Sequence, residues 1–312
     1  MELPAFEPLP DRDAYGVIRG FVYQVHRTID LWLDLDDRTI LECECGEDID
    51  LVETPPASAE PVRVLEQLKH RVSNLTLRSE DVIEAVANFV MTQERNPGVN
   101  VRYRFFTNAS PGAEREIIWP NGGTGIGTWN EVHRGGIGDE AAVAQLKGLI
   151  QQGLSNRFSD STSSSPTPAE LVLRMGVAEF RANVIQRLEF ALSGPSFADQ
   201  RPALTAKLKN KQIAASDEEA RELLDRLFTH VFLLLTGAGS KRLDQEQLNN
   251  IVGEATLVQI DRQLLRRVDE LLRETQGQVA DLSSQVARVE VGLAGVQDQV
   301  GTMSANVREV RQ

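Results

Sequence analysis

The sequence predicts a mixed α/β domain followed by an α-helical domain and a C-terminal coiled coil. Three observations indicate this fold class: strand and helix signals mix in the N-terminal half, helical spacing dominates the next part, and a heptad repeat runs to the end. At 312 residues, the chain is long enough for about two domains. We expect an α/β domain at 1–158, a linker at 159–168, a helical domain at 169–260 and an oligomerisation helix at 261–312.

The composition excludes a generally basic nucleic-acid coat and a membrane-spanning protein. The 33 basic and 46 acidic side chains give a net charge of -13, so any contact with DNA or RNA must be local. No apolar run approaches the roughly 20 residues that a membrane-spanning helix needs. The first ten residues lack the features of a secretion signal, and Cys43 and Cys45 are too close together for an ordinary disulfide framework. We therefore expect a cytoplasmic protein without a membrane partner.

The segment Asp30–Glu60 is strongly acidic, with eleven carboxylates and one base, Arg38. Within it, Thr39–Cys45 alternates and is rich in strand formers, which predicts a strand. In an uninterrupted strand every second side chain shares a face, so four carboxylates would gather there. These are Glu42, Glu44, Asp48 and Asp50. Such a face is stable where water solvates it or where a divalent cation such as Mg²⁺ neutralises it.

The segment Val62–Arg71 fits either a strand or a helix. Its apolar residues have helical spacing, whereas the prolines before it and its β-branched start favour a strand. In a strand, Gln67 and Lys69 point the same way, which places an amide oxygen beside an ammonium group. Glu66 would then point to the other face.

The part after the linker predicts packed helices. One helix is expected from Val177 through Leu192, and a second begins at Ser216, which stands three residues before Glu219 in a capping-box pattern. Between them, three lysines and one arginine form a compact basic stretch that is either a solvated face or a contact to DNA. Its members are Arg201, Lys207, Lys209 and Lys211.

The C-terminal segment has the strongest periodicity, because its apolar residues alternate steps of three and four. They are Leu272, Thr275, Val279, Leu282, Val286, Val289, Leu293, Val296, Val300, Met303, Val307 and Val310. This is the a/d seam of a heptad repeat, and its four glycines fall outside the a and d positions. The seam predicts association without fixing the number of strands. The alternative is a single amphipathic helix docked on its own chain.

Several short motifs carry no site of their own. Cys43, Cys45 and His70 fall short of a four-ligand zinc site, and we expect both cysteines to be buried in a strand. The glycine runs at 121–127 and 237–241 lack the spacing and context of a nucleotide-binding loop.

Four sequence blocks of the N-terminal half occur in a familiar order: GFVYQVHRTIDLWL, ECECGEDIDLV, EQLKHR and VRYRFFTNAS. Together they cover about Asp13–Leu154 and resemble the N-terminal PD-(D/E)XK nuclease domain (Mrr-like, CBASS-effector type) of bacterial antiphage defence proteins. That group includes CBASS endonuclease effectors, Lamassu and antiviral STAND NTPases. The resemblance implies an α/β restriction-endonuclease-like domain that acts as an Mg²⁺-dependent DNA endonuclease.

The resemblance also implies roles for five site residues and a supporting role for Asn108. Gln24 matches a helical residue that lines the family's site, and Glu44 and Asp48 match an acidic block in which Asp48 is the expected metal ligand. Gln67 and Lys69 match a Q-x-K form of the last half-motif, and Asn108 closes a strand near the site. Gln67 stands where the superfamily pattern has a carboxylate. An amide binds Mg²⁺ more weakly, and Glu44 is the residue that would compensate.

The chemistry expected of this set is phosphodiester hydrolysis. A metal at Asp48, Gln67 and Glu44 would polarise the phosphate, while Lys69 would orient the attacking water or stabilise the developing charge. The alternative is a catalytically inactive sensor or scaffold that keeps the nuclease fold and recruits a partner through its coiled coil. The expected partners are DNA, further copies of the chain through the C-terminal helix, and a separate sensor or ATPase protein.

Overall fold

The computed structural model describes residues 15–309 apart from 55–59, 72, 116, 118, 120–122, 137–138 and 159–164. Contacts divide the chain into two compact units, Met1–Val252 and Gly253–Gln312. The elements in chain order are α1 (Tyr15–Trp32), β1 (Thr39–Cys43), β2 (Ile49–Glu53), β3 (Val62–Lys69), α2 (Glu80–Arg95), β4 (Asn100–Thr107), α3 (Gly125–His133), α4 (Glu140–Arg157), α5 (Pro168–Arg174), α6 (Val177–Asn183), the 3₁₀ helix η3 (Ile185–Arg187), β5 (Leu188–Ala191), α7 (Gln200–Asn210), α8 (Asp217–Thr236), β6 (Arg242–Leu243) and α9 (Gln245–Glu309).

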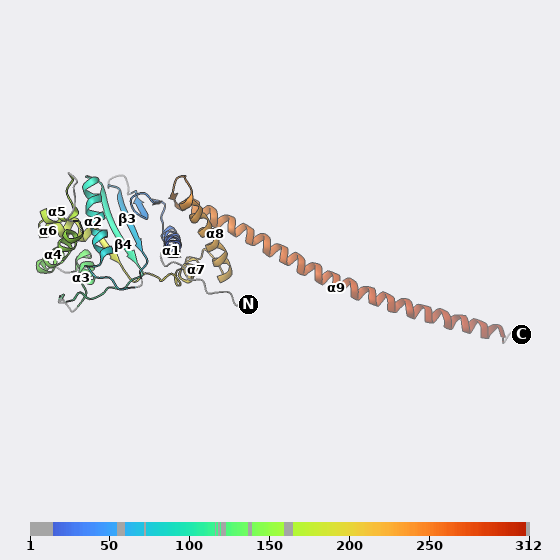
Figure 1. Ribbon diagram of the computed structural model, residues 1–312. Helices are drawn as coiled ribbons and strands as arrows, with labels where there is room; N and C mark the ends of the chain where they lie inside the picture. Colours follow the sequence, from blue (N-terminus) through green and yellow to red (C-terminus); the bar gives the residue numbers. More distant parts are fainter. Residues whose placement is uncertain are drawn as a thin grey trace, which may run out of the picture. The chain divides into compact units, whose positions relative to one another are not determined.

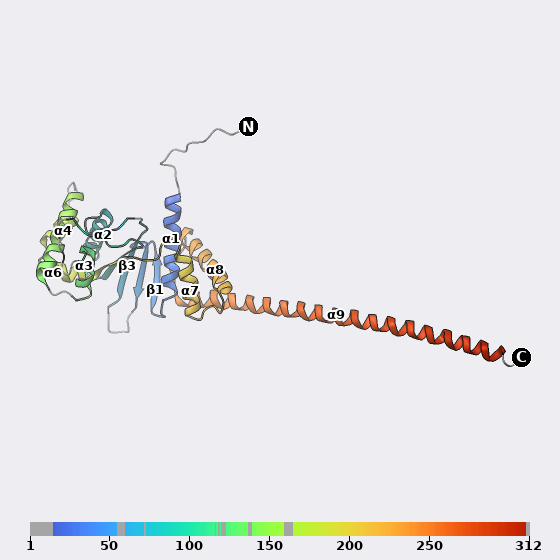
Figure 2. The ribbon, with the colours of Figure 1, turned by 90° about the horizontal axis from the view of Figure 1, so that it is seen from below.

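The first unit is a mixed α/β fold built on one sheet with the strand order β5-β4-β3-β2-β1-β6. Strands β1, β2 and β3 form an antiparallel meander, and β4 and β5 continue the sheet parallel to β3. Figure 1 shows α1, α7 and α8 on one face of the sheet and α2 to α6 on the other. The same two layers are separated by the sheet in the view from below in Figure 2. A mixed α/β domain is therefore confirmed.

Strand β3 resolves the ambiguity of the segment Val62–Arg71. All of Val62–Lys69 is extended and pairs with β4 on one side, and Val62–Glu66 pair with β2 on the other. A central strand is favoured over a helix because both of its edges receive backbone hydrogen bonds from neighbours, and its β-branched start suits a pleated surface.

The acidic segment is not one strand. Strand β1 ends at Cys43, residues 44–48 form a turn, and β2 begins at Ile49, so the expectation of a single acidic face was wrong. Glu42 and Asp50 face each other across the hairpin. The guanidinium of Arg63 bonds the Glu42 carboxylate and lies 3.1 Å from Asp50 Oδ2. Neither solvent nor a metal is needed to neutralise this pair, because Arg63 does so.

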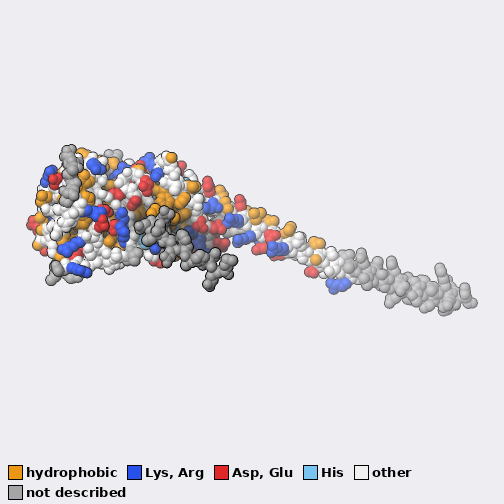
Figure 3. Space-filling model, viewed as in Figure 1, with side chains coloured by type: hydrophobic (Ala, Val, Ile, Leu, Met, Phe, Trp, Pro, Cys, Tyr) orange, Lys and Arg blue, Asp and Glu red, His pale blue; other side chains and the backbone are white. Residues whose placement is uncertain are grey.

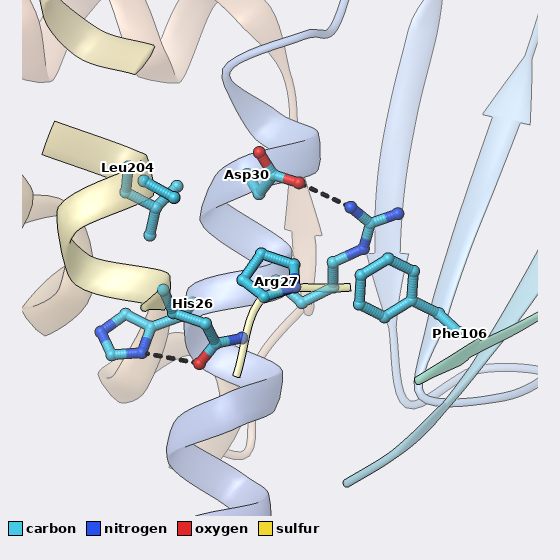
Figure 4. Close-up of a pocket in the computed structure, with 8 residues that line it drawn as sticks. His26, Arg27, Asp30, Phe106 and Leu204 are labelled. Atoms are coloured by element: carbon cyan, nitrogen blue, oxygen red, sulfur yellow. Dashed lines mark hydrogen bonds and ion pairs between the residues drawn. The ribbon is translucent and has the colours of Figure 1, made fainter. Parts of the chain in front are cut away.

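A buried charge cluster joins α1 to the sheet. The Glu66 side chain is completely buried, and its carboxylate accepts hydrogen bonds from Arg27 of α1 at 2.6 Å and from Arg104 of β4 at 3.2 Å. Arg27 also bonds Asp30 at 2.5 Å and lies 3.8 Å from the ring centroid of Phe106. Figure 4 shows this arrangement, with Arg27 extending from α1 toward Asp30 beside the Phe106 ring.

The opposite face of the sheet carries the main apolar core, to which α2, α3 and α4 contribute. A buried carboxylate organises the loop before α3: Glu114 accepts hydrogen bonds from the backbone of Leu77 and Gly125 and from the Trp119 indole. A Cβ added at Gly125 would lie 2.6 Å from Glu114 Oε1, which explains a glycine here. In its described residues, the glycine run at 121–127 therefore serves the start of a helix.

The part after the linker is not wholly helical. The helix expected from Val177 ends at Asn183, and Leu188–Ala191 forms β5, which pairs with Tyr103–Phe106 of β4. The spacing of Phe180, Val184, Leu188 and Leu192 suggested a longer helix, but Leu188 is buried as part of a strand. Residues 159–164 of the predicted linker lie outside the described part, and α5 begins at Pro168 after a capping box at Thr167.

The basic stretch on and beside α7 is occupied by the chain's own carboxylates. Lys207 Nζ lies 2.6 Å from Asp30 and 2.5 Å from Asp34, which Lys211 also contacts. Two further cations pair with carboxylates of α8: Lys209 with Asp217, and Arg201 with Asp225. These cations therefore join α7 to α1 and α8, which favours the structural reading of the stretch over a contact to DNA. Helix α8 begins as predicted, with Ser216 capping the backbone of Glu219.

Helix α9 is continuous for 65 residues, which confirms a long C-terminal helix. Its side chains are described as far as residue 285, apart from residue 259, and at residue 288. Large apolar side chains are exposed along this part, and Figure 3 shows them spaced among charged ones. Leu265 and Leu272 continue the a positions, and Leu257, Leu264 and Leu271 stand at g, which makes the stripe wider than a strict a/d seam. In the described part of the chain, no helix is long and apolar enough to cross a membrane.

Replacement of Glu66 by glutamine should destabilise the first unit strongly. The change leaves Arg27, whose side chain is 12% exposed, without its buried counter-charge, and we expect a loss of about 3 kcal/mol in the free energy of unfolding. Urea denaturation measures the difference. Glu189→Gln is the matched control: this carboxylate also bonds Arg104 but is 35% exposed, so its loss should cost less than about 1 kcal/mol. Equal losses in the two variants would contradict the assigned role of Glu66.

Candidate functional site

The candidate site is built on the turn that joins β1 to β2. Glu44 has a positive φ of 56°, a conformation that costs a residue with a side chain roughly 1 kcal/mol or more. Its backbone N–H donates to the Asp48 carbonyl at 3.2 Å, which closes the turn. Gly46 and Glu47 donate their backbone N–H groups to the buried Asp50 carboxylate. A Cβ on Gly46 would lie 2.8 Å from Leu65, so this position requires glycine.

Asp48 lies beside the strand that carries the Q-x-K pattern. Its Oδ2 atom accepts a hydrogen bond of 2.6 Å from the backbone N–H of Leu68, the residue between Gln67 and Lys69. Burial raises the pKa of the Asp48 carboxyl, and the negative charge of Glu44 raises it further. The Leu68 hydrogen bond and the positive charge of Lys69 act in the opposite direction. The structure therefore brings Asp48, Gln67 and Lys69 into one electrostatic environment.

Gln67 has a polar atom that the described chain does not satisfy. Its side chain is 8% exposed, and its Oε1 atom is buried without a hydrogen-bond partner among the described residues. A buried unpaired acceptor costs about 1–3 kcal/mol, so native proteins keep such atoms mainly where something else binds them. Gln67 Oε1 is thus an oxygen available to a ligand, on the residue that precedes Leu68, whose backbone N–H bonds Asp48.

Gln24 and Glu44 approach the turn from the side of α1. Gln24 Nε2 donates to Glu44 Oε1 at 2.7 Å and to the Asp48 carbonyl at 3.2 Å. Gln24 therefore holds both ends of the turn and bonds the carboxylate of the exposed Glu44. Gln67 and Lys69 belong to the other face of β3, because Glu66, the residue before Gln67, bonds α1. The five predicted residues converge on one turn but approach it from both faces of the sheet.

Glu47 is a carboxylate of this turn that the sequence interpretation missed. Burial raises the pKa of its carboxyl, the charges of Asp48 and Asp50 raise it further, and the charge of Lys69 lowers it. Glu47 therefore shares its surroundings with Asp48 and Lys69. The signal that could have found it is Gly46, one residue earlier, because a glycine inside a strand-like pattern indicates a break in the alternation.

The ligand types at this turn fit a hard cation. Asp48 and Glu44 supply carboxylates, each with one oxygen engaged in a hydrogen bond, and Gln67 supplies the unpaired amide oxygen. Carboxylate and amide oxygens are ligands that Mg²⁺ accepts. Within the described ranges there is no group of three or more His, Cys, Asp or Glu residues placed to hold a metal. A site here therefore depends on the amide of Gln67 as well as on carboxylates.

Asn108 supports the end of β3. Its Oδ1 accepts from the backbone N–H of Arg71 at 2.8 Å, and its Nδ2 donates to the Arg71 carbonyl at 2.7 Å. Thr107, the residue before it, is buried and pairs with Lys69 in the parallel β3–β4 ladder. Asn108 thus fixes the chain two residues after Lys69, which agrees with the supporting role that the sequence suggested.

The cysteines do not contribute a nucleophile or a zinc site. Cys43 is buried in β1, and burial raises the pKa of its thiol to about 12. Cys45 is exposed in the turn, so the expectation that both cysteines are buried was wrong for this one. It lies in the turn that follows β1, where the alternation of the strand no longer applies.

Comparison with known proteins gives a fold-level likeness. No family model and no curated protein matches the sequence. Similar solved structures include the Acinetobacter baumannii Cap4 SAVED/CARF-domain containing receptor with the cyclic trinucleotide 3'3'3'-cAAA, at a TM-score of 0.45 and 11% identity over 79% of this chain and 46% of that one. Another is the Moraxella osloensis Cap4 SAVED/CARF-domain containing receptor, at 0.43 and 10% over 78% and 48%. This chain spans about half the length of those receptors. Because both TM-scores are below 0.5, the functional argument rests on the site itself.

Replacement of Asp48 by asparagine should raise the melting temperature of the metal-free protein. The raised pKa means that ionised Asp48 is disfavoured in the folded state, so its contribution is most favourable below the ordinary pKa near 4 and is lost as pH rises through the folded pKa. The gain in Asp48→Asn should be largest near neutral pH and vanish at about pH 4. Differential scanning fluorimetry in EDTA across this range measures it.

The same variant should lose stabilisation by Mg²⁺. At a Mg²⁺ concentration about 100-fold above the dissociation constant, the wild type should gain about 2.7 kcal/mol, or about 5 to 10 °C, and Asp48→Asn should gain almost nothing. Asp37→Asn, an exposed acidic residue outside the turn, is the control and should behave as the wild type in both respects. An identical Mg²⁺ shift in Asp48→Asn would contradict a metal site at this turn.

Proposed function

We propose that this chain is a metal-dependent DNA endonuclease that acts as an effector in bacterial antiphage defence in the cytoplasm. One observation supports the proposal above the others: the unpaired, buried amide oxygen of Gln67 lies on the strand segment to which Asp48 is bonded and which carries Lys69. A metal-dependent nuclease site needs oxygen ligands for the cation and a positively charged side chain near the same phosphate. Asp48 and Gln67 would supply the oxygen ligands, and Lys69 the positive charge. The sequence resemblance to antiphage nuclease domains supports the biological setting.

Each residue has a distinct part in the proposed reaction. Mg²⁺, bound by Asp48 with Gln67 and Glu44, would supply electrophilic assistance to the phosphate and lower the pKa of the attacking water. Lys69 donates hydrogen bonds to the water or to a phosphate oxygen, where negative charge accumulates. Gln24 holds Glu44 and the Asp48 carbonyl, so it keeps the turn in its strained conformation.

The alternative is a catalytically inactive sensor or scaffold with the same fold. Two observations favour it: the third ligand is an amide in place of a carboxylate, and α9 exposes a long apolar stripe that suits a partner. The two functions differ in their need for Mg²⁺. Calorimetry that finds no Mg²⁺ binding to the wild type, together with an intact fold, would support the scaffold and exclude the enzyme.

Plasmid cleavage tests the proposed activity. The purified wild type should nick or cut supercoiled plasmid with Mg²⁺ and not with EDTA. Asp48→Asn and Lys69→Ala should each lower the rate by on the order of 100-fold, because each removes a group that stabilises charge in the transition state. Lys209→Ala is the control, since its ammonium pairs with Asp217 at the surface. Equal rates in the wild type and both site variants would refute the assignment.

Gln67→Glu provides an additional arm of that assay. A carboxylate in place of the amide restores the superfamily pattern, and it should lower the Mg²⁺ concentration that gives half-maximal activity. Gln152→Glu, a new carboxylate on the exposed part of α4, controls for the added charge alone. A higher Mg²⁺ requirement in Gln67→Glu than in the wild type would argue against Gln67 as a ligand.

We also propose that α9 associates with α9 of further copies of this chain. Its stripe repeats with a heptad period, so one helix can offer the same complementary seam to another, and an isolated exposed helix of this length would leave many apolar side chains in water. A separate sensor or ATPase protein remains the proposed source of the activating signal.

Substitution within the stripe should reduce the mass of the assembly. The double variant Leu265→Ser and Leu272→Ser removes two exposed a-position side chains, and truncation after Glu274 removes most of the seam. Both should lower the molar mass measured by light scattering at equal protein concentration. Arg266→Ser with Arg273→Ser alters the neighbouring b positions and should leave the mass unchanged. A monomeric wild type would contradict self-association.

A further inference from the structure

A guanidinium beside the candidate site has no counter-charge in the described chain. Three arginines near this end of the sheet have carboxylate partners: Arg27 and Arg104 bond Glu66, and Arg71 bonds Asp81. Arg19, on the first turns of α1, forms no ion pair or hydrogen bond with any described residue, and its Nε atom is buried without a partner. A buried N–H of a charged group that lacks an acceptor is costly, which makes Arg19 a candidate for an external anion.

Arg19 is held in place by aromatic packing. Its Cζ atom lies 4.9 Å from the ring centroid of Phe197, a distance at which a cation is attracted to the ring face. The same ring packs edge-on against His70 at 6.5 Å between centroids, and His70 packs against Tyr23 at 5.3 Å. Phe197 therefore orients Arg19 toward the side of the molecule where His70 lies.

This cluster adjoins the candidate site on two elements. His70 directly follows Lys69 at the end of β3, and Tyr23 directly precedes Gln24 on α1. Burial lowers the pKa of His70, and the positive charge of Arg19 lowers it further, which places the two groups within electrostatic range. His70 thus links the two cations at the end of this strand: it follows Lys69 in the chain, and the charge of Arg19 acts on its ring.

We propose that Arg19, supported by Phe197 and flanked by His70, binds a backbone phosphate of the nucleic-acid strand next to the one at Asp48, Gln67 and Lys69. The inference rests on the proposed function, because it takes the nucleic acid as the substrate of that site. A guanidinium suits this task since its planar N–H groups match two phosphate oxygens. A protein with a net charge of -13 needs such local cations to hold a polyanion.

The test measures duplex binding in place of cleavage. All proteins carry Lys69→Ala so that Mg²⁺ can be present during titration of a labelled short duplex over a range of salt concentrations. Arg19→Ala should weaken binding and reduce the slope of log K against log salt by about 0.9, the value for one lost phosphate contact on duplex DNA. Arg19→Lys keeps the charge and should keep the slope. Arg174→Ala, an exposed arginine on α5, should match the parent.

The outcomes separate this contact from the proposed activity. An unchanged slope in Arg19→Ala, with cleavage that still depends on Asp48 and Lys69 in otherwise wild-type protein, overturns the phosphate contact alone. If Arg19→Ala reduces the slope but the otherwise wild-type protein does not cleave DNA, the phosphate contact is supported and the nuclease activity is overturned. A titration with inorganic phosphate distinguishes a free-anion site: if Arg19→Ala affects only that titration, the strand contact is overturned. Absence of duplex binding by the parent overturns it as well.

Discussion

The buried carboxylate of Glu66 determines which face of β3 carries the candidate site. It bonds Arg27 of α1 and Arg104 of β4, so this side chain must point toward α1. Because side chains alternate along a strand, Gln67 and Lys69 are then directed to the opposite face. A slip of the strand register by one residue would turn each side chain of β3 to the opposite face of the sheet. It would also leave the three charged groups of this cluster unpaired. The register of the site is therefore held by a charge cluster that takes no part in the proposed chemistry.

The turn at residues 44–48 combines features that lower the stability of the metal-free fold. Glu44 has a positive φ, burial raises the pKa of the Asp48 and Glu47 carboxyls, and Gln67 Oε1 has no partner among the described residues. Each feature is unfavourable by itself, and their concentration at one turn is typical of a binding or catalytic site. A cation bound there would relieve the repulsion among the carboxylates and satisfy the amide. Strain and electrostatics thus point to the same few residues.

The sequence predicted what depends on near neighbours along the chain. The shared face of Gln67 and Lys69 follows from strand alternation, and the long C-terminal helix follows from its heptad spacing, because both are local periodicities. Two other expectations depended on contacts between distant residues. Leu188–Ala191 forms a strand because it pairs with the edge of β4, and the paired residues Arg104 and Glu189 are 85 positions apart in the chain. Lys207 is neutralised by Asp30, which is 177 positions away. No local pattern contains such partners.

The distribution of charge explains why the acidic balance does not prevent contact with a polyanion. Arg63 neutralises Glu42 and Asp50, and Lys207 and Lys211 neutralise Asp30 and Asp34, so much of the acidic segment is paired within the chain. The carboxylates left at the turn are Glu44, Glu47 and Asp48, and none of these makes an ion pair among the described residues. A phosphate can approach them only together with a cation. The positive charge of Lys69 acts on Glu47 and Asp48, so it favours an anion beside the same turn at which a cation would bind.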